Sequence, residues 1–345
     1  MDEKSLRTLE YFKILERVGG YCEFPVSEEK ALNIRPSGDV FEARRLLAET
    51  REAVEVLASH PEISIGGARD IRSIVDLAVH GGVLAPNELL DIKFTLISAR
   101  NLGRIFERSS QEYPRLADIA AQLPPPLGII DAISSAISDR GDILDSASEK
   151  LASIRRDLRV VHDRLLSKLQ KMVDNPDVAP LLQETLITQR DGRYVLPLRA
   201  EFKGRIKSIV HDQSSSGATI FVEPLTVVDL NNQYRELHLA ERDEERRILA
   251  ALSQQVGFYS NDLLQAVEII AELDLALAKA KYAIEIQASE PVLRVIKNGG
   301  KTQHPGTIMK LYQARHPLLD PETVVPIDVE LSPETYTLVI TGPYT

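Results

Sequence analysis

The sequence predicts a mainly helical fold in which two long helical segments flank one small β module. The chain has 345 residues, is rich in Leu, Ala, Ile, Glu and Arg, and contains only 5% aromatic residues, a composition typical of long helices. Apolar residues recur at three- and four-residue spacing over most of the first 290 residues, and the spacing changes to alternation only between Ile187 and Glu223. At roughly 150 residues per domain, this length suggests two or three structural units.

Residues 1–145 are expected to form a helical core domain. Asp39 is a candidate N-cap for a helix over residues 40–59, and Glu42, three residues further on, completes a capping box. Glycine pairs and a run of three prolines separate the other apolar stretches. Further helices are therefore expected near residues 69–79, 86–109 and 114–123.

Residues 146–190 are expected to form an outgoing helix, and residues 225–290 a returning one. In the outgoing segment Ser146 and Glu149 have the spacing of a capping box, and an apolar seam follows over residues 151–172. The returning segment has the same apolar spacing and contains no proline. We therefore expect the two helices to pack antiparallel and to hold the β module at their far end.

Residues 191–224 form the predicted β module, in which β-branched residues and a Ser- and Gly-rich turn at 214–217 indicate short antiparallel strands. The strands are expected at residues 194–198, 205–210 and 219–222. The last segment, residues 291–345, reads as strands and loops rather than helices. Its strands are expected at residues 307–312, 323–331 and 336–340.

The β module carries a charge opposite to that of the whole chain. The net charge is −10, from 41 basic and 51 acidic residues, and this balance repels polyanions. Between residues 190 and 210, however, there are six basic and only two acidic residues. If residues 199–207 were a strand, their alternating charges would share one face, which could neutralise nucleic-acid phosphates. A solvated outer face of a small sheet is an equally good interpretation of this pattern.

The candidate residues for contacts with nucleic acid are Arg193, Arg199, Lys203, Arg205, Lys207 and His211. The chain contains no Trp and few other aromatic residues. It therefore offers few platforms on which the bases of a single strand could stack.

The sequence offers no assembled catalytic or metal site. The single cysteine, Cys22, excludes an internal disulfide and a Cys-based zinc site, and we expect it to be a small buried apolar residue. The seven histidines lack metal-ligand spacing, and the Ser-rich turn lacks the Gly-x-Ser-x-Gly motif of hydrolases. The charged run at 241–247 is interpreted as a solvated helix face. Without a long apolar run or an apolar signal core, a cytoplasmic protein with no membrane partner is expected.

Several long motifs resemble those of the bacterial MutS-two family, a group of MutS paralogues. The motifs are GRYVLP from residue 192, KGRI from 203, VHDQSSSGAT from 210 and EP at 223. Supporting matches are LEY at residue 9, GDILDSAS at 141, ARHPLL at 314 and VITGP at 339. The resemblance covers the whole chain.

This resemblance implies a MutS-type helical core, a lever of long helices, a clamp at the tip of the lever and the first strands of an ABC-type ATPase domain. Residues 1–145 would be the core, 146–190 and 225–290 the lever, 191–224 the clamp, and 291–345 the truncated ATPase domain. Members of the family are implied to act on branched DNA, where they suppress recombination, or on collided ribosomes. They are also implied to dimerise through the ATPase domain and to carry a C-terminal Smr endonuclease domain.

The resemblance further implies that the full-length family binds ATP and Mg²⁺. The candidate residues of a partial nucleotide site are Arg315, His316, Pro317, Thr341, Gly342 and Pro343. The family follows Thr-Gly-Pro with Asn and then Gly-Gly-Lys, whereas this sequence continues with Tyr344 and Thr345. We therefore expect this chain alone to bind nucleotide weakly and to be inactive as an ATPase, because the phosphates lack the Walker lysine and its loop.

Together, these observations predict the clamp and lever of an ATP-driven dimer that binds DNA or ribosomal RNA. Charge alone does not separate the two targets, because both present phosphate backbones. The alternative is a structural coiled-coil adaptor whose tip binds a protein partner. Salt-dependent binding through the basic residues of the tip would discriminate between these functions.

Overall fold

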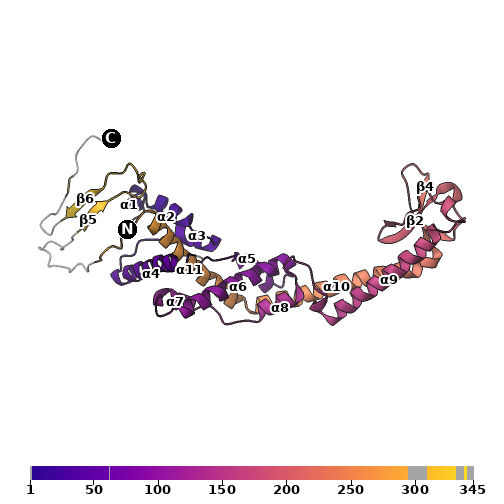
Figure 1. Cartoon of the computed structure of the whole chain (residues 1–345), viewed down its shortest axis with the longest axis horizontal. Helices are drawn as coiled ribbons and strands as arrows, with labels where there is room; N and C mark the ends of the chain where they lie inside the picture. Colours follow the sequence, from indigo (N-terminus) through magenta and orange to yellow (C-terminus); the bar gives the residue numbers. More distant parts are fainter. Residues whose placement is uncertain (1, 62, 294–308, 332–337, 340–345) are drawn as a thin grey trace. The chain divides into compact units, whose positions relative to one another are not determined.

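The computed structural model describes residues 2–61, 63–293, 309–331 and 338–339 (Figure 1). Helices account for most of the described residues, and the strands form two small antiparallel sheets. The prediction of a mainly helical fold with small β modules is therefore confirmed. The chain divides into two compact units, of which the first comprises residues 1–75, 91–127 and 259–345, and the second residues 76–90 and 128–258.

The N-terminal 145 residues are helical, as predicted. Their helices are α1 (Glu3–Thr8), α2 (Tyr11–Gly19), α3 (Pro25–Leu32), α4 (Val40–Ser59), α5 (Arg72–Val79), α6 (Pro86–Arg108), α7 (Pro114–Ala120) and α8 (Ile129–Ala136). Helix α4 has the predicted bounds and the predicted cap, because the Asp39 carboxylate accepts a hydrogen bond of 2.8 Å from the backbone N–H of Phe41.

The first unit is built around α11 (Ser260–Glu285), which packs against α2, α3, α4 and α7. One face of α11 is buried from Leu263 to Tyr282. Asp274, fully buried on this helix, accepts hydrogen bonds from the backbone N–H groups of Glu23 and Phe24, at 2.9 and 3.0 Å, and from the Ser27 hydroxyl. Asp274 thereby caps α3, whose own N-cap residue, Phe24, has no side-chain acceptor.

Replacing Asp274 is expected to destabilise the first unit. In Asp274→Ala the backbone N–H groups of Glu23 and Phe24 lose their acceptor, whereas the Ser27 hydroxyl can still donate to the Phe24 carbonyl at 2.6 Å. An unsatisfied buried donor costs about 1–3 kcal/mol, so we expect a loss of about 2–4 kcal/mol. Urea unfolding measures the change. The matched control is Glu272→Ala on the same helix, whose exposed ion pair with Lys30 contributes about 1 kcal/mol or less. Equal effects of the two variants would contradict the capping role.

The C-terminal segment of the first unit contains a two-stranded sheet of β5 (Met309–Ala314) and β6 (Ile327–Leu331). These strands correspond to the predictions at 307–312 and 323–331, with shifted ends. The predicted strand at 336–340 lies mostly outside the described residues. Thr341, Gly342 and Pro343 also lie outside them.

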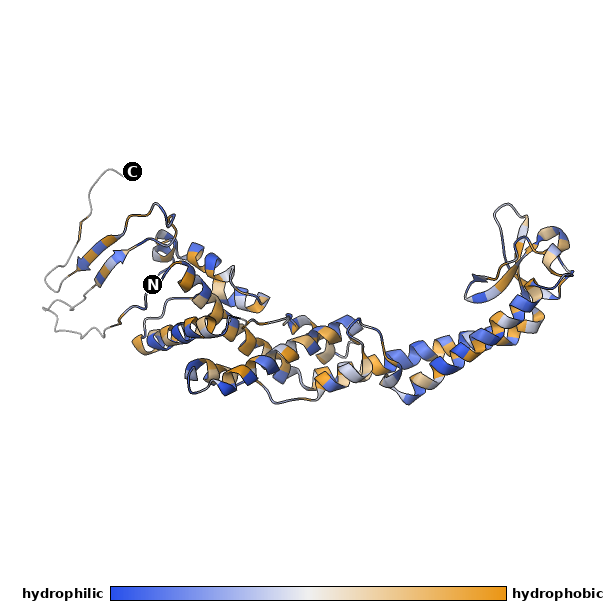
Figure 2. Ribbon diagram, in the orientation of Figure 1, coloured by the Kyte–Doolittle hydropathy of each residue, from blue (hydrophilic) through white to orange (hydrophobic). Residues whose placement is uncertain are grey.

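The second unit contains a long antiparallel coil of α9 (Glu149–Val173) and α10 (Val228–Phe258). Arg155 of α9 donates to Glu241 and Glu245 of α10, both at 2.8 Å, and nearer the end of α9 Lys168 donates to the Thr226 carbonyl at 3.3 Å. A residue near the start of α9 therefore pairs with residues 241 and 245, and a residue near its end pairs with residue 226. This order shows that the two helices are antiparallel, which confirms the prediction. Hydrophilic and hydrophobic residues are interspersed along the whole length of both helices (Figure 2).

Two details of the coil differ from the prediction. The N-cap of α9 is Ser148, whose hydroxyl accepts from the Leu151 N–H at 3.0 Å, whereas Ser146 lies in the short 3₁₀ helix η1 (Asp145–Ala147). Ser148 is favoured because its hydroxyl also donates to Glu244 of α10 at 2.9 Å. The predicted single helix at 225–290 is divided at Tyr259 into α10 and α11.

The β module is a four-stranded antiparallel sheet in the order β1-β2-β4-β3. Its strands are β1 (Thr188–Arg190), β2 (Arg193–Arg199), β3 (Ser208–Gln213) and β4 (Thr219–Pro224). Leu196 and Leu198 of β2 and Val222 of β4 are fully buried and form one apolar cluster with Leu165 and Leu169 of α9. The sheet is therefore anchored on the last turns of α9 by hydrophobic burial.

The predicted strand at 205–210 is displaced to 208–213, so the expected alternation of charges on one strand face is wrong. Residues 200–202 form the 3₁₀ helix η3, and residues 203–207 form a loop. Gly204 has a φ of +88°, a conformation that glycine adopts without strain. The backbone turns tightly here, since the N–H groups of Lys203 and Arg205 donate to the carbonyls of Ala200 and Phe202.

Candidate nucleic-acid interface

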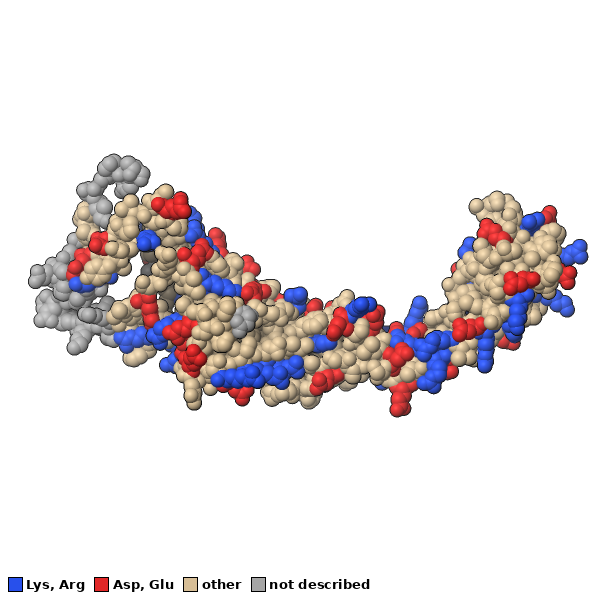
Figure 3. All heavy atoms as spheres, viewed as in Figure 1, with Lys and Arg blue, Asp and Glu red and all other residues tan. Residues whose placement is uncertain are grey.

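Four of the predicted nucleic-acid contacts are exposed and lie between the end of β2 and the start of β3. They run from Arg199, opposite Thr219 at the start of β4, to Lys207, whose carbonyl accepts from Leu225 just after β4. We call Arg199, Lys203, Arg205 and Lys207 the tip surface; Arg199 ends β2, and the other three lie on the loop at 203–207. Figure 3 shows basic side chains projecting around this module. None of the four side chains forms an ion pair or hydrogen bond with a residue that the structure describes. They can therefore neutralise phosphates without breaking an internal interaction.

The other two predicted contacts, Arg193 and His211, have an internal partner. Both side chains bind the carboxylate of Glu223, which is fully buried: the Arg193 guanidinium donates at 2.9 and 3.1 Å, and His211 Nε2 lies 2.6 Å from Oε2. The side-chain amide of Asn231, on α10, donates to the same carboxylate at 2.7 Å. Arg193 and His211 thus connect strands of the module to each other around one buried charge.

Sequence reasoning did not identify Glu223 as the partner of these two side chains. The available signal was a carboxylate in an otherwise apolar strand, because a buried carboxylate requires a positive or hydrogen-bonding partner. Arg190 also interacts with residues of the β module. Its guanidinium lies 4.0 Å from the ring centre of Phe221 and 3.3 Å from the carboxylate of Asp212. Both Arg190 and Arg193 therefore have contacts within the module.

The three glutamates of the charged run at 241–247 pair with residues of α9, which corrects in part its interpretation as a solvated face. The other four residues, Arg242, Asp243, Arg246 and Arg247, are exposed. Glu244 is only 1% exposed and pairs with Arg247 at 2.7 Å and with Lys150 of α9 at 3.1 Å. Arg247 is the main reason that the pKa of Glu244 falls to about 2. Reversing the charge of Glu241, Glu244 or Glu245 would damage the coil, so these three residues are unsuitable as a control for changes at the tip surface. Arg242 and Arg246 of the same run are exposed and pair with no residue that the structure describes.

A separate aromatic cluster lies where the β module meets the coil. His162 Nε2 is 2.9 Å from the hydroxyl of Tyr194, and the His162 ring stacks on Tyr234 of α10 with 5.6 Å between ring centres. Burial raises the pKa of Tyr234 to about 12. The three rings are partly buried and pack against one another.

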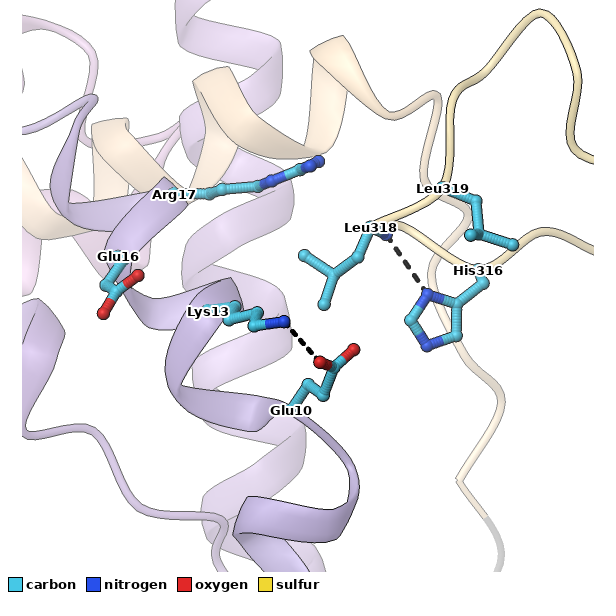
Figure 4. Close-up of a pocket in the computed structure, with 7 residues that line it drawn as sticks. All are labelled: Glu10, Lys13, Glu16, Arg17, His316, Leu318 and Leu319. Carbon is cyan, nitrogen blue, oxygen red and sulfur yellow. Dashed lines mark hydrogen bonds and ion pairs between the residues drawn. The ribbon is translucent and has the colours of Figure 1, made fainter.

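The predicted nucleotide residues that the structure describes lie in the loop after β5. A pocket of about 610 Å³ is present here, lined by Glu10, Lys13, Glu16, Arg17, His316, Leu318 and Leu319 (Figure 4). Of the predicted residues, only His316 lines it. The Arg315 guanidinium donates to Gln287 at 3.4 Å, and the Pro317 carbonyl accepts from Arg17 at 2.6 Å.

This pocket does not fit a nucleoside triphosphate. Its lining contains two carboxylates, and one of its two basic residues, Lys13, forms an ion pair with Glu10 that lowers the pKa of this carboxyl group. No group of three or more His, Cys, Asp or Glu residues in the described part of the chain could hold a metal ion.

Two further sequence predictions concern the first unit and the membrane. Cys22 is partly buried against an apolar cluster, and burial raises the pKa of its thiol to about 11. The thiol is therefore protonated at neutral pH, in keeping with an apolar packing role. No helix among the described residues is long and apolar enough to cross a membrane.

Comparisons with known proteins match the chain over its whole length. "Endonuclease MutS2" of Thermomicrobium roseum is 44% identical over 351 residues, which are 100% of this chain and 44% of that protein. Proteins of the same name from Geobacillus sp. and Bacillus cereus strain Q1 are each 38% identical over 100% of this chain and 43% of their own length. No protein-family model matches the chain. The chain thus spans less than half the length of these curated relatives.

Proposed function

Because the chain belongs to the MutS2 family, called MutS-two above, we propose that its β module is a clamp that binds the phosphate backbone of nucleic acid. The observation that carries this proposal is the tip surface, four exposed cations without a partner among the described residues, in a chain with a net charge of −10. Local positive charge of this kind attracts phosphates, while the remaining surface repels them.

The contrast between the tip surface and the other basic residues of the module supports this function. Arg190 and Arg193 have carboxylate partners within the module, whereas the tip surface has none among the described residues. A side chain with an internal partner would have to give up that interaction to bind a phosphate. A phosphate that binds the tip surface therefore gains the full attraction of its cations, because no ion pair has to be broken first.

Branched or duplex DNA and ribosomal RNA are the proposed targets, in a cytoplasmic protein. Dimerisation through an ATPase domain, binding of ATP and Mg²⁺, and endonuclease activity are proposed only for the longer protein, because this chain spans 44% of the length of its relative from T. roseum. The adaptor alternative retains the same coil and module but assigns the tip to a protein partner.

Titration of the chain against branched DNA, duplex DNA and ribosomes at several salt concentrations tests this proposal. If the four cations of the tip surface each contact one phosphate of a duplex, the logarithm of the association constant falls with the logarithm of the salt concentration with a slope of about −3.6, at −0.9 per contact. Absence of binding at low salt, or binding that does not depend on salt, would favour the adaptor. The most tightly bound of the three ligands identifies the preferred target.

A further inference from the structure

We propose that the outer face of α9 is a second phosphate-binding surface, so that a B-form DNA duplex bound at the tip surface lies along the coil. This inference rests on the proposed function and extends it from the end of the β module to the helix that carries the module. The α9 surface is defined as Arg156, Arg164 and Lys171.

The three side chains of the α9 surface are exposed and none has an ion pair or hydrogen bond to any part of the chain that the structure describes. At about 100° per residue they lie within about 80° of one another around the helix axis. The apolar seam from Leu151 to Val173 lies on the other side of α9 and is buried. The α9 surface therefore points away from the coil interface, in contrast to Arg155, which is engaged by two carboxylates of α10.

Charge is distributed unequally between the two helices of the coil. Helix α9 contains seven basic and three acidic residues, whereas α10 contains four basic and six acidic residues. Figure 3 shows basic side chains along the coil as well as around the module. Acidic residues of α10 pair with two of the seven basic residues of α9, Lys150 and Arg155, which leaves five basic against three acidic residues on α9. The remaining excess of two positive charges attracts a polyanion to the α9 side.

The spacing of the α9 surface favours a B-form duplex over other polyanions. At 1.5 Å per residue, Arg156 and Arg164 are separated by about 12 Å along the axis, and Arg164 and Lys171 by about 10.5 Å. The major groove of B-DNA is about 12 Å wide, so neighbouring cations can reach phosphates on its two sides. Double-stranded RNA has a deep and narrow major groove instead.

A single strand fits this surface poorly. The aromatic residues of the β module, Tyr194, Phe202 and Phe221, are all partly buried, and α9 contains no Phe, Tyr or Trp. Base stacking contributes much of the affinity for single strands, and neither α9 nor the β module has a fully exposed ring on which bases could stack. The α9 surface presents positive charges at fixed spacing and no side chain that would recognise unpaired bases.

The test compares two triple variants that change the net charge equally. The first is Arg156→Glu, Arg164→Glu and Lys171→Glu; the matched control on α10 is Arg235→Glu, Arg242→Glu and Arg246→Glu. The α10 residues are likewise exposed, and none pairs with a residue that the structure describes. Binding to DNA duplexes of about 10 and about 30 base pairs is measured between about 50 and 200 mM salt, the range over which phosphate contacts dominate the salt response.

For the 30-base-pair duplex, we expect the α9 variant to lose about tenfold or more in affinity and to have a salt slope smaller by about 2.7 than the parent. We expect the parent to bind the longer duplex more tightly than the shorter one. The α9 variant should bind both duplexes with similar affinity. Replacing the same three α9 residues by Gln should also weaken binding to the duplex, but by less than replacement by Glu. Circular dichroism and the unfolding midpoint check that each variant is folded.

Three outcomes would overturn this inference. Equal losses in the α9 and α10 variants would show an effect of net charge alone. An equal loss of affinity for an RNA duplex of the same length would contradict the choice of B-form DNA. Unchanged binding in the α9 variant, with weakened binding when the tip surface is altered, would refute this inference but leave the proposed function intact. If the parent chain binds no nucleic acid, the proposed function itself fails.

Discussion

Reversing three charges of the tip surface, in Lys203→Glu, Arg205→Glu and Lys207→Glu, is expected to weaken nucleic-acid binding more than the same number of reversals on α10. Each phosphate contact contributes about 0.9 to the salt slope, so loss of three contacts with a duplex reduces the slope by about 2.7. The fold should be preserved, because these residues are exposed on a loop and have no side-chain partner among the residues described.

The matched control for this prediction is again the α10 triple, Arg235→Glu, Arg242→Glu and Arg246→Glu. It changes the net charge by the same amount, so long-range repulsion is matched and only the position differs. Fluorescence anisotropy with branched and duplex DNA, and co-sedimentation with ribosomes, measure the affinities. If the parent and both variants bind equally, the tip does not contact phosphates and the adaptor alternative is favoured.

Much of the helical architecture could be predicted because it depends on short-range patterns. Asp39 caps α4 as expected, since a capping side chain acts on backbone groups two residues away. The coil was predictable from the apolar seam of α9 alone. The N-cap of α9 could not be predicted, because Ser146 and Ser148 are equally good capping residues. Ser148 differs in its contact with Glu244, which is distant in the sequence.

The register of the β module was harder to predict for a related reason. Residues 199–207 alternate in polarity as an edge strand would, yet Gly204 and the η3 turn convert them into a loop. A glycine that takes up a positive φ cannot be distinguished in the sequence from one that lies in a strand. The basic residues were identified correctly as exposed, but for a strand geometry that the chain does not adopt.

The candidate site was predicted only as a group of charges, because a sequence shows which residues are basic but not which have partners. Arg193 and Arg199 are equivalent in the sequence pattern. In the structure, Arg193 is bound to the buried Glu223 at a separation of 30 residues, whereas Arg199 is exposed and unpaired among the described residues. Long-range pairing of this kind separates structural cations from those available to a ligand.

Removal of the Glu223 carboxylate is expected to destabilise the β module strongly. In Glu223→Ala, the Arg193 guanidinium, with 19% of its side chain exposed, loses the carboxylate that binds it. His211 loses the same partner, and the side-chain amide of Asn231 keeps only the Tyr194 carbonyl as an acceptor among the described residues. Removing one partner of a buried ion pair costs about 3–5 kcal/mol because the other charge remains uncompensated. The partial exposure of Arg193 places the expected loss near the lower end, at about 3 kcal/mol.

Hydrogen exchange of the backbone amides at residues 193–224 measures this loss locally, which is preferable to global unfolding in a chain of two compact units. Asp212→Ala is the control, because its pair with Arg190 is about half exposed and such pairs contribute about 1 kcal/mol or less. We expect faster exchange throughout the module in Glu223→Ala and little change in the control. If protection were unchanged in Glu223→Ala, Arg193 and His211 would not depend on this carboxylate, and both would again be candidates for direct contacts with phosphates.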